Sequence, residues 1–139
     1  MYALRGDHAR ARAYADSARQ AYEARTRAHP DWAYAHACYG QTLAYLGRTA
    51  DAIREAERAV ALEPLTRDAW QGYFREVNLA TVYAKVGESD RAVTTLEHLL
   101  SVPGLPVSRG WLELAPEFAS LRSNPRFEQL IADTATERH

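Results

Sequence analysis

The sequence has little cysteine and no long apolar run, and its charges nearly cancel. The single cysteine, Cys38, cannot form a disulfide within the chain and fits a reducing compartment, so a cytoplasmic location is expected. No apolar stretch approaches the roughly 20 residues of a membrane-spanning helix, and the N-terminus lacks the apolar core of a signal peptide. The 17 basic and 18 acidic residues predict no basic surface for nucleic acid or anionic lipid.

Patterns typical of catalytic or metal sites are also missing. His36 and Cys38 are two apart on an expected helix and point about 200° apart, so they cannot share one metal ion. The glycines are dispersed along the chain and form no phosphate-binding loop. Glu113 and Glu117 have no partner acid or base nearby in the sequence. We therefore expect no catalytic residue, no metal and no cofactor, and a protein that is not an enzyme.

What the sequence does contain is a repeated helical pattern, clearest over residues 33–66. Its apolar positions recur at intervals of three and four, the period of a helix, and Gly47 interrupts them once before Pro64 closes the stretch. The same pattern places an apolar residue four positions before Gly6, Gly47 and Gly87, which are spaced by 41 and 40 residues. Self-similarity at such a period predicts stacked helix pairs, with residues 1–5 as the last turn of a truncated helix.

The expected helices follow from this period and from residues that favour helix ends. We expect left-handed backbone at Gly47 and Gly87, and burial of Trp70 and Trp111. Asp7, Thr49, Ser89 and Asn124 are the expected helix caps, and Pro30 the first residue of its helix. The predicted main helices cover residues 7–28, 30–46, 49–62, 68–86 and 89–100, with a sixth, short helix over 125–132 and no sheet.

The pattern changes at Val102, so the chain is divided into repeats at 1–101 and a C-terminal segment at 102–139. This segment begins with a loop rich in proline and glycine. Residues 111–114 and 118–121 are too short for full helices and are expected to form turns against the core. A terminal repeat needs a cover for its exposed side, and we expect the segment to supply it.

The second and third units match position by position. The second unit supplies His36, Tyr39, Gly40, Leu43, Gly47, Ala52, Ala56, Ala59 and Pro64, and the third supplies Glu76, Leu79, Ala80, Tyr83, Gly87, Ala92, Leu96 and Leu99. At these residues the chain resembles the tetratricopeptide repeat family. It departs from that family at the large first position, at the second aromatic position and in its spacing, which exceeds the usual length of about 34 residues.

This resemblance implies an all-α, right-handed superhelical solenoid of helical hairpins with a C-terminal capping helix. The implied function is a protein–protein interaction module that docks a peptide, a neighbouring domain or another copy. A purely structural spacer within a multidomain regulator is the alternative. The segment from Leu114 to Leu130 is also similar to the end of bacterial repeat modules that follow kinase, winged-helix or cyclase domains, which implies a fragment of a larger bacterial regulatory protein.

The family's peptide groove, carried across residue by residue, gives eight candidate positions. Their spacing lines one face of each helix, and aromatic side chains favour peptide contacts. The alternative is that the aromatic residues only pack between repeats. A clamp for a C-terminal carboxylate is not expected, because its Lys and Asn positions hold Ala37, Gln41 and Phe74. The candidates are Tyr34, Cys38, Gln41 and Tyr45 in one helix and Phe74, Asn78, Thr81 and Lys85 in the next.

A second candidate surface lies on the helix expected over residues 7–28. If its preceding neighbour is truncated, an apolar stripe is left open to water, and such stripes usually find cover. The same surface on a second chain is one such cover, which predicts a homodimer through this helix. The candidate residues for self-association are Ala11, Tyr14, Ala15, Ala18 and Tyr22.

Overall fold

The computed structural model describes residues 5–137, and these residues are all-helical, with no strand. The all-α prediction is confirmed; residues 1–4, expected to belong to a truncated helix, lie outside the described part. No helix in the described part is long and apolar enough to cross a membrane. The elements are α1 (Arg5–Ala28), α2 (Ala33–Tyr45), α3 (Thr49–Leu62), α4 (Ala69–Lys85), α5 (Ser89–Ser101), α6 (Arg109–Leu114), the 3-10 helix η1 (Pro116–Leu121) and α7 (Pro125–Glu137).

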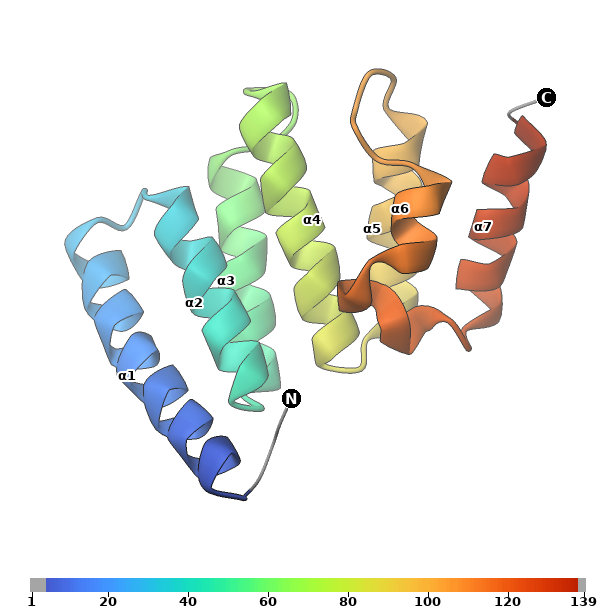
Figure 1. Ribbon diagram of the computed structural model, residues 1–139. Coiled ribbons are helices and arrows are strands. Elements are labelled where there is room, and N and C mark those ends of the chain that lie inside the picture. Colours follow the sequence, from blue (N-terminus) through green and yellow to red (C-terminus); the bar gives the residue numbers. More distant parts are fainter. Residues whose placement is uncertain (1–4, 138–139) are drawn as a thin grey trace.

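The helices form two hairpins, α2–α3 and α4–α5, which lie side by side (Figure 1). Helix α1 packs on α2 at one end, and α6, η1 and α7 cover the other end. One continuous core runs from Leu43 in the first hairpin through Leu79 and Leu96 in the second to Phe118 and Phe127 in the C-terminal segment. The first helices of the two hairpins, α2 and α4, contact each other directly, so their side chains share one face.

The two hairpins turn through the same backbone motif. After α2, the amide of Arg48 donates to the Leu43 carbonyl (2.9 Å) and Gly47 donates to Ala44 (3.1 Å). After α4, Glu88 donates to Tyr83 at 2.8 Å and Gly87 to Ala84 at 3.3 Å. Both glycines adopt the expected left-handed conformation, with φ of 80° and 87°. This pairing of donors is the Schellman motif, which satisfies the last carbonyls of a helix and reverses the chain.

Small residues let the helices of each hairpin approach closely. Ala52, Ala56 and Ala59 on α3 are completely buried, as are the matching Ala92, Leu96 and Leu99 on α5. Opposite α3, a Cβ added at Gly40 would lie 3.1 Å from the Ala52 carbonyl oxygen, so the backbones nearly touch there. The first hairpin is therefore held by backbone proximity, and the second by larger leucine side chains.

The large first position of each repeat holds a buried polar side chain, which faces a partner on the second helix of its own hairpin. In the first hairpin, His36 Nδ1 lies 2.6 Å from Glu55 Oε1 on α3, and Nε2 donates to the Pro30 carbonyl at 2.7 Å. In the second hairpin the order of the charges is reversed: Glu76 on α4 faces His98 on α5, with Oε2 and Nε2 3.6 Å apart. His36 and Glu76 are both more than 90% buried, so neither departure from the family pattern leaves a hole.

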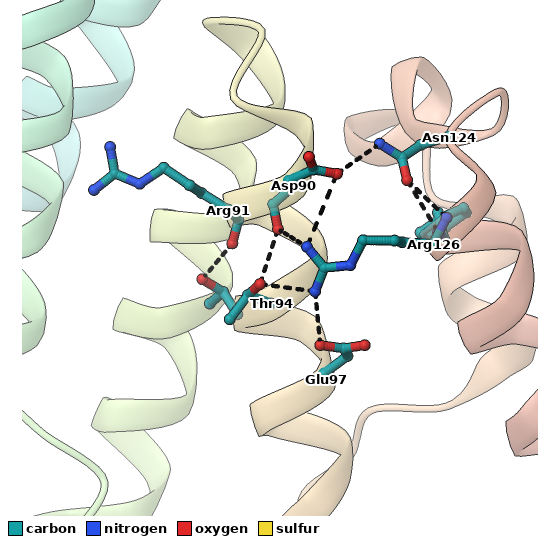
Figure 2. A network of polar contacts seen from close by, with 8 residues as sticks. Asp90, Arg91, Thr94, Glu97, Asn124 and Arg126 are labelled. Carbon is teal, nitrogen blue, oxygen red and sulfur yellow. Dashed lines mark hydrogen bonds and ion pairs between the residues drawn. The ribbon is translucent and has the colours of Figure 1, made fainter.

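The C-terminal segment covers the second hairpin, as expected for its position. Leu112, Phe118 and Leu121 are fully buried in the core. Figure 2 shows how α7 is then held on α5 by polar contacts: the Arg126 guanidinium donates to Thr94 Oγ1 at 2.9 Å and Glu97 Oε1 at 3.0 Å. Asn124 both caps α7, accepting from the Arg126 amide at 2.9 Å, and donates to Asp90 Oδ1 at 3.2 Å. The cap predicted at Asn124 is confirmed, and α7 runs five residues beyond the expected 132.

Several predicted helix ends are wrong. Gly6 lies inside the first turn of α1, which begins at Arg5, so Gly6 ends no helix and Asp7 is not its cap. Pro30 does not begin α2: its carbonyl accepts from His36, and the helix starts three residues later, at Ala33. Thr49 and Ser89 are the first residues of α3 and α5, and no side chain caps either helix.

The two tryptophans also differ from expectation. The predicted burial of Trp70 is wrong: the side chain is 62% exposed in the first turn of α4, with its ring edge-on to Phe74. Trp111 is half-buried, with its ring edge-on to Phe118 at 5.7 Å. Only one of these rings therefore contributes to the core.

Gly72 provides a test of backbone packing between α4 and the loop before it. A Cβ at Gly72 would lie 2.6 Å from the Leu65 nitrogen and 2.7 Å from its Cα. We expect Gly72→Ala to lower the free energy of unfolding by about 1–3 kcal/mol through this clash, although alanine normally favours helices. The matched control is Gly110→Ala in α6, where the added methyl meets open space. Urea denaturation showing both variants equally stable would contradict the close approach.

Glu76 provides a test of the buried polar pair. Burial raises the pKa of its carboxyl above the ordinary value of 4.5, and attraction to His98 lowers it by less. The folded state therefore binds the proton more tightly than the unfolded chain. The contribution of Glu76 to the free energy of unfolding is thus fully present below pH 4.5, and it is lost as pH rises through the raised pKa. We expect Glu76→Gln to gain stability relative to wild type between pH 4 and pH 7 in urea titrations. A pH-independent difference would contradict this assignment.

Candidate functional site

A groove lies between α2 and α4. It has a volume of about 490 Å³ and is lined from three helices. Five of the eight predicted groove residues line it: Tyr34, Cys38, Gln41, Phe74 and Asn78. Four further residues line it that were not predicted as groove residues: Tyr22, Ala37, Thr42 and Arg75.

A chain of amide groups crosses the groove and leaves one donor unpaired. Lys85 Nζ donates to Gln41 Oε1 at 3.1 Å, and Gln41 Nε2 donates to Asn78 Oδ1 at 2.7 Å. Because an ammonium group can only donate, the lysine fixes the orientation of the Gln41 amide, which in turn fixes that of Asn78. The buried Nδ2 of Asn78 has no acceptor in the described part of the chain. An unpaired buried donor costs free energy, and an acceptor would recover it only after a side-chain movement that exposes Nδ2.

Aromatic rings form the other half of the groove. Tyr34 and Phe74 are 51% and 43% exposed, and each continues into a further exposed ring at the start of its helix. Trp32 lies 6.0 Å from Tyr34, and Trp70 lies 5.1 Å from Phe74, measured between ring centroids. These rings do not simply pack between the repeats, because much of their surface faces solvent.

Cys38 lies between two tyrosines. Hydrogen bonding to Cys38, together with partial burial, raises the pKa of the Tyr22 hydroxyl, and hydrogen bonding to Cys38 also raises that of Tyr34. Both hydroxyls therefore stay protonated and are held near the sulfur. The cysteine is partly buried.

Arg75 is the one buried cation of the groove. Its Nε donates to Glu63 Oε1 at 2.9 Å, its Nη2 donates to Gln71 Oε1 at 3.0 Å, and its guanidinium carbon lies 5.7 Å from the Tyr34 ring centroid. The arginine thus braces Tyr34 from α4. An arginine on a helix normally indicates a solvated face. The contact of Arg75 with Tyr34 follows from the packing of α4 on α2, which the sequence pattern does not predict.

Three predicted groove residues lie elsewhere. Thr81 is buried and donates its hydroxyl to the Val77 carbonyl at 2.9 Å, so its prediction as a groove residue is wrong. Lys85 reaches the groove only through its bond to Gln41. Tyr45 lines a separate hollow of about 450 Å³ between α1 and the end of α2, together with Ala11, Tyr14, Ala15, Gln41 and Thr42.

The candidate self-association residues fall into two groups. Ala11 is exposed and Tyr14 is 70% exposed at the N-terminal half of α1. Ala15, Ala18 and Tyr22 are half-buried because this part of α1 packs on α2. The open surface is therefore smaller than the predicted stripe and centres on Tyr14.

No group of three or more His, Cys, Asp or Glu side chains in the described part is arranged to hold a metal ion. His36 faces Glu55 and a carbonyl, away from Cys38, in keeping with their separation on the helix. The polar groups in and near the groove include amides, hydroxyls and the Lys85 ammonium, and they lie near exposed rings. Such groups suit non-covalent binding. Compared with protein-family models, curated protein sequences and solved structures, the chain matches none.

Proposed function

We propose that this chain is a protein-interaction module that docks an extended peptide in the groove between α2 and α4. It acts by binding rather than by catalysis. The observation that carries the proposal is the unpaired Asn78 Nδ2 beside two exposed aromatic rings in a groove of about 490 Å³. An extended peptide presents the free carbonyl oxygens that such a donor needs, and apolar side chains that the rings can cover.

We further infer that the hairpins are tetratricopeptide-like repeats of a right-handed solenoid. The recurrence of the Schellman motif at Gly47 and Gly87, 40 residues apart, supports this inference, because it repeats the backbone as well as the sequence pattern. The resemblance of the C-terminal segment favours a place in a larger bacterial regulatory protein of the cytoplasm. There the module would dock a partner of that regulator.

The alternative, a purely structural spacer, predicts a groove filled by the chain's own side chains. The groove instead remains open in the described structure, with Tyr34 and Phe74 about half exposed. A spacer has no use for a buried donor without an acceptor. These features favour binding over spacing.

Selection from a phage-displayed library of random 12-residue peptides tests the proposal. We expect enriched peptides whose binding weakens at least about tenfold with Phe74→Ala, the truncation of a central aromatic contact. Asn78→Leu should also weaken them, because it removes the donor while keeping the side chain's bulk. Trp111→Phe is the matched control, since that ring lies in the C-terminal segment. No enrichment, or enriched peptides indifferent to Phe74 and Asn78, would contradict the proposal.

A second candidate function is self-association through α1. Tyr14 and Tyr45, 70% and 50% exposed, border the hollow of about 450 Å³ at the open edge of the stack. In a two-fold contact, Tyr14 of each copy would fill the hollow of the other, which removes both rings from water.

Sedimentation of the chain tests this second proposal. We expect a dimer at high micromolar concentration, and a monomer for Tyr14→Glu, because the introduced charge would have to be buried in the contact. Tyr14 is preferred to Ala15 or Ala18, whose replacement would disturb the packing of α1 on α2. Trp70→Glu, which alters an exposed ring on α4, should leave the dimer intact. A wild-type chain that stays monomeric would end the proposal.

A further inference from the structure

Four exposed rings lie in two pairs, one pair at the N-terminal end of α2 and one at that of α4. We call Trp32, Tyr34, Trp70 and Phe74 the aromatic platform. Their exposed fractions are 43%, 51%, 62% and 43%, and within each helix the two rings are in contact. A gathered exposed apolar surface of this kind marks an interaction site. The rings offer flat apolar faces and few polar groups, so they select for ligand side chains that are rigid and apolar.

Two side chains on α4, Asn78 and Lys85, have N–H groups without an acceptor in the described chain. Asn78 Nδ2 has no acceptor within the described chain, and the Lys85 ammonium carries two further N–H groups beyond its bond to Gln41. Among the described residues that line the groove there is no Asp or Glu, and the buried cation Arg75 is already paired with Glu63. The groove therefore fits a ligand that supplies acceptors and negative charge and presents few donors of its own.

A proline-rich segment has this chemistry. Proline has no backbone N–H, and the polyproline II conformation has no internal hydrogen bonds, so its carbonyl oxygens remain free to accept. Its rings pack on aromatic side chains, and its preformed shape reduces the entropy lost on binding. A helical peptide fits less well, because its carbonyl oxygens are used within the helix. We propose that the groove binds a proline-rich segment carrying one acidic residue, an inference that rests on the function proposed above.

The distance between platform and lysine sets the register of such a ligand. Phe74 and Lys85 lie on α4 about three turns apart, roughly 16 Å along the helix axis. A polyproline II segment advances about 3.1 Å per residue, so the acidic residue lies about five residues from the prolines on the platform. The charged contact is exposed and contributes modestly, whereas the prolines carry most of the affinity.

Calorimetric titration with terminally blocked synthetic peptides tests this inference. The probe has two proline pairs and a glutamate about five residues from the first pair, and is made with the glutamate on either side. Blocking both ends removes any free terminal carboxylate. We expect one orientation to bind, and replacement of the prolines by alanine to weaken it at least about tenfold. Replacement of the glutamate by glutamine should weaken it about two- to fivefold.

Protein variants assign these effects to the groove. Phe74→Ala should remove most of the binding, and Lys85→Gln should abolish the difference between the glutamate and glutamine peptides while leaving the proline preference. Tyr45→Ala, an exposed ring outside the platform, is the control, and circular dichroism checks that each variant is folded. Equal binding of the alanine and proline peptides would overturn the inference while leaving peptide docking intact. The inference would also be overturned if no proline-rich peptide bound while the phage-selected peptides still bound at Phe74. Peptide docking itself would then still stand.

Discussion

The structure depends on the reversal of the chain after α2 and after α4. A helix that ends with a left-handed residue can satisfy its last carbonyls and send the next helix back along its side. Gly47 and Gly87 adopt this conformation without steric cost, and the alanines or leucines that follow on α3 and α5 then face the preceding helix. Because both reversals are alike, α2 and α4 end up side by side, and their shared face becomes the groove.

The two polar pairs lie at matching positions of the two hairpins. His36 stands in the first hairpin and Glu76 in the second. Each of these finds a partner of opposite character on the second helix of its own hairpin, Glu55 and His98 respectively. A buried polar group is costly only when it is unpaired, so the exchange of charge between repeats preserves both sites. The pairs also link the two helices of each hairpin.

The groove contains side chains held by hydrogen bonds and ring contacts, together with exposed aromatic rings and one donor without an acceptor in the described chain. Arg75 braces Tyr34, and Lys85 orients two amides, so the side chains of α2 and α4 are fixed relative to each other before any ligand arrives. What remains is the exposed ring surface and the free Asn78 donor. In the proposed binding of a peptide, these side chains would lose little conformational freedom, which favours a ligand that is itself stiff.

Local features of the sequence determined most of the fold. The helical period and the glycines 40 residues apart predict the hairpins, and Asn124 followed by Pro125 predicts the start of α7, because these signals act within a turn or two of the chain. Tertiary contacts decided the rest. The bracing role of Arg75 depends on where α4 lies against α2, and so do the hydrogen bonds by which Gln41 on α2 joins Asn78 and Lys85 on α4. At Gly72 the backbone of α4 lies so close to the backbone of Leu65 that a side chain would clash, and no local sequence pattern predicts this contact. Side-chain periodicity specifies which face of a helix is apolar, whereas the neighbours that meet that face are set by packing across the whole stack.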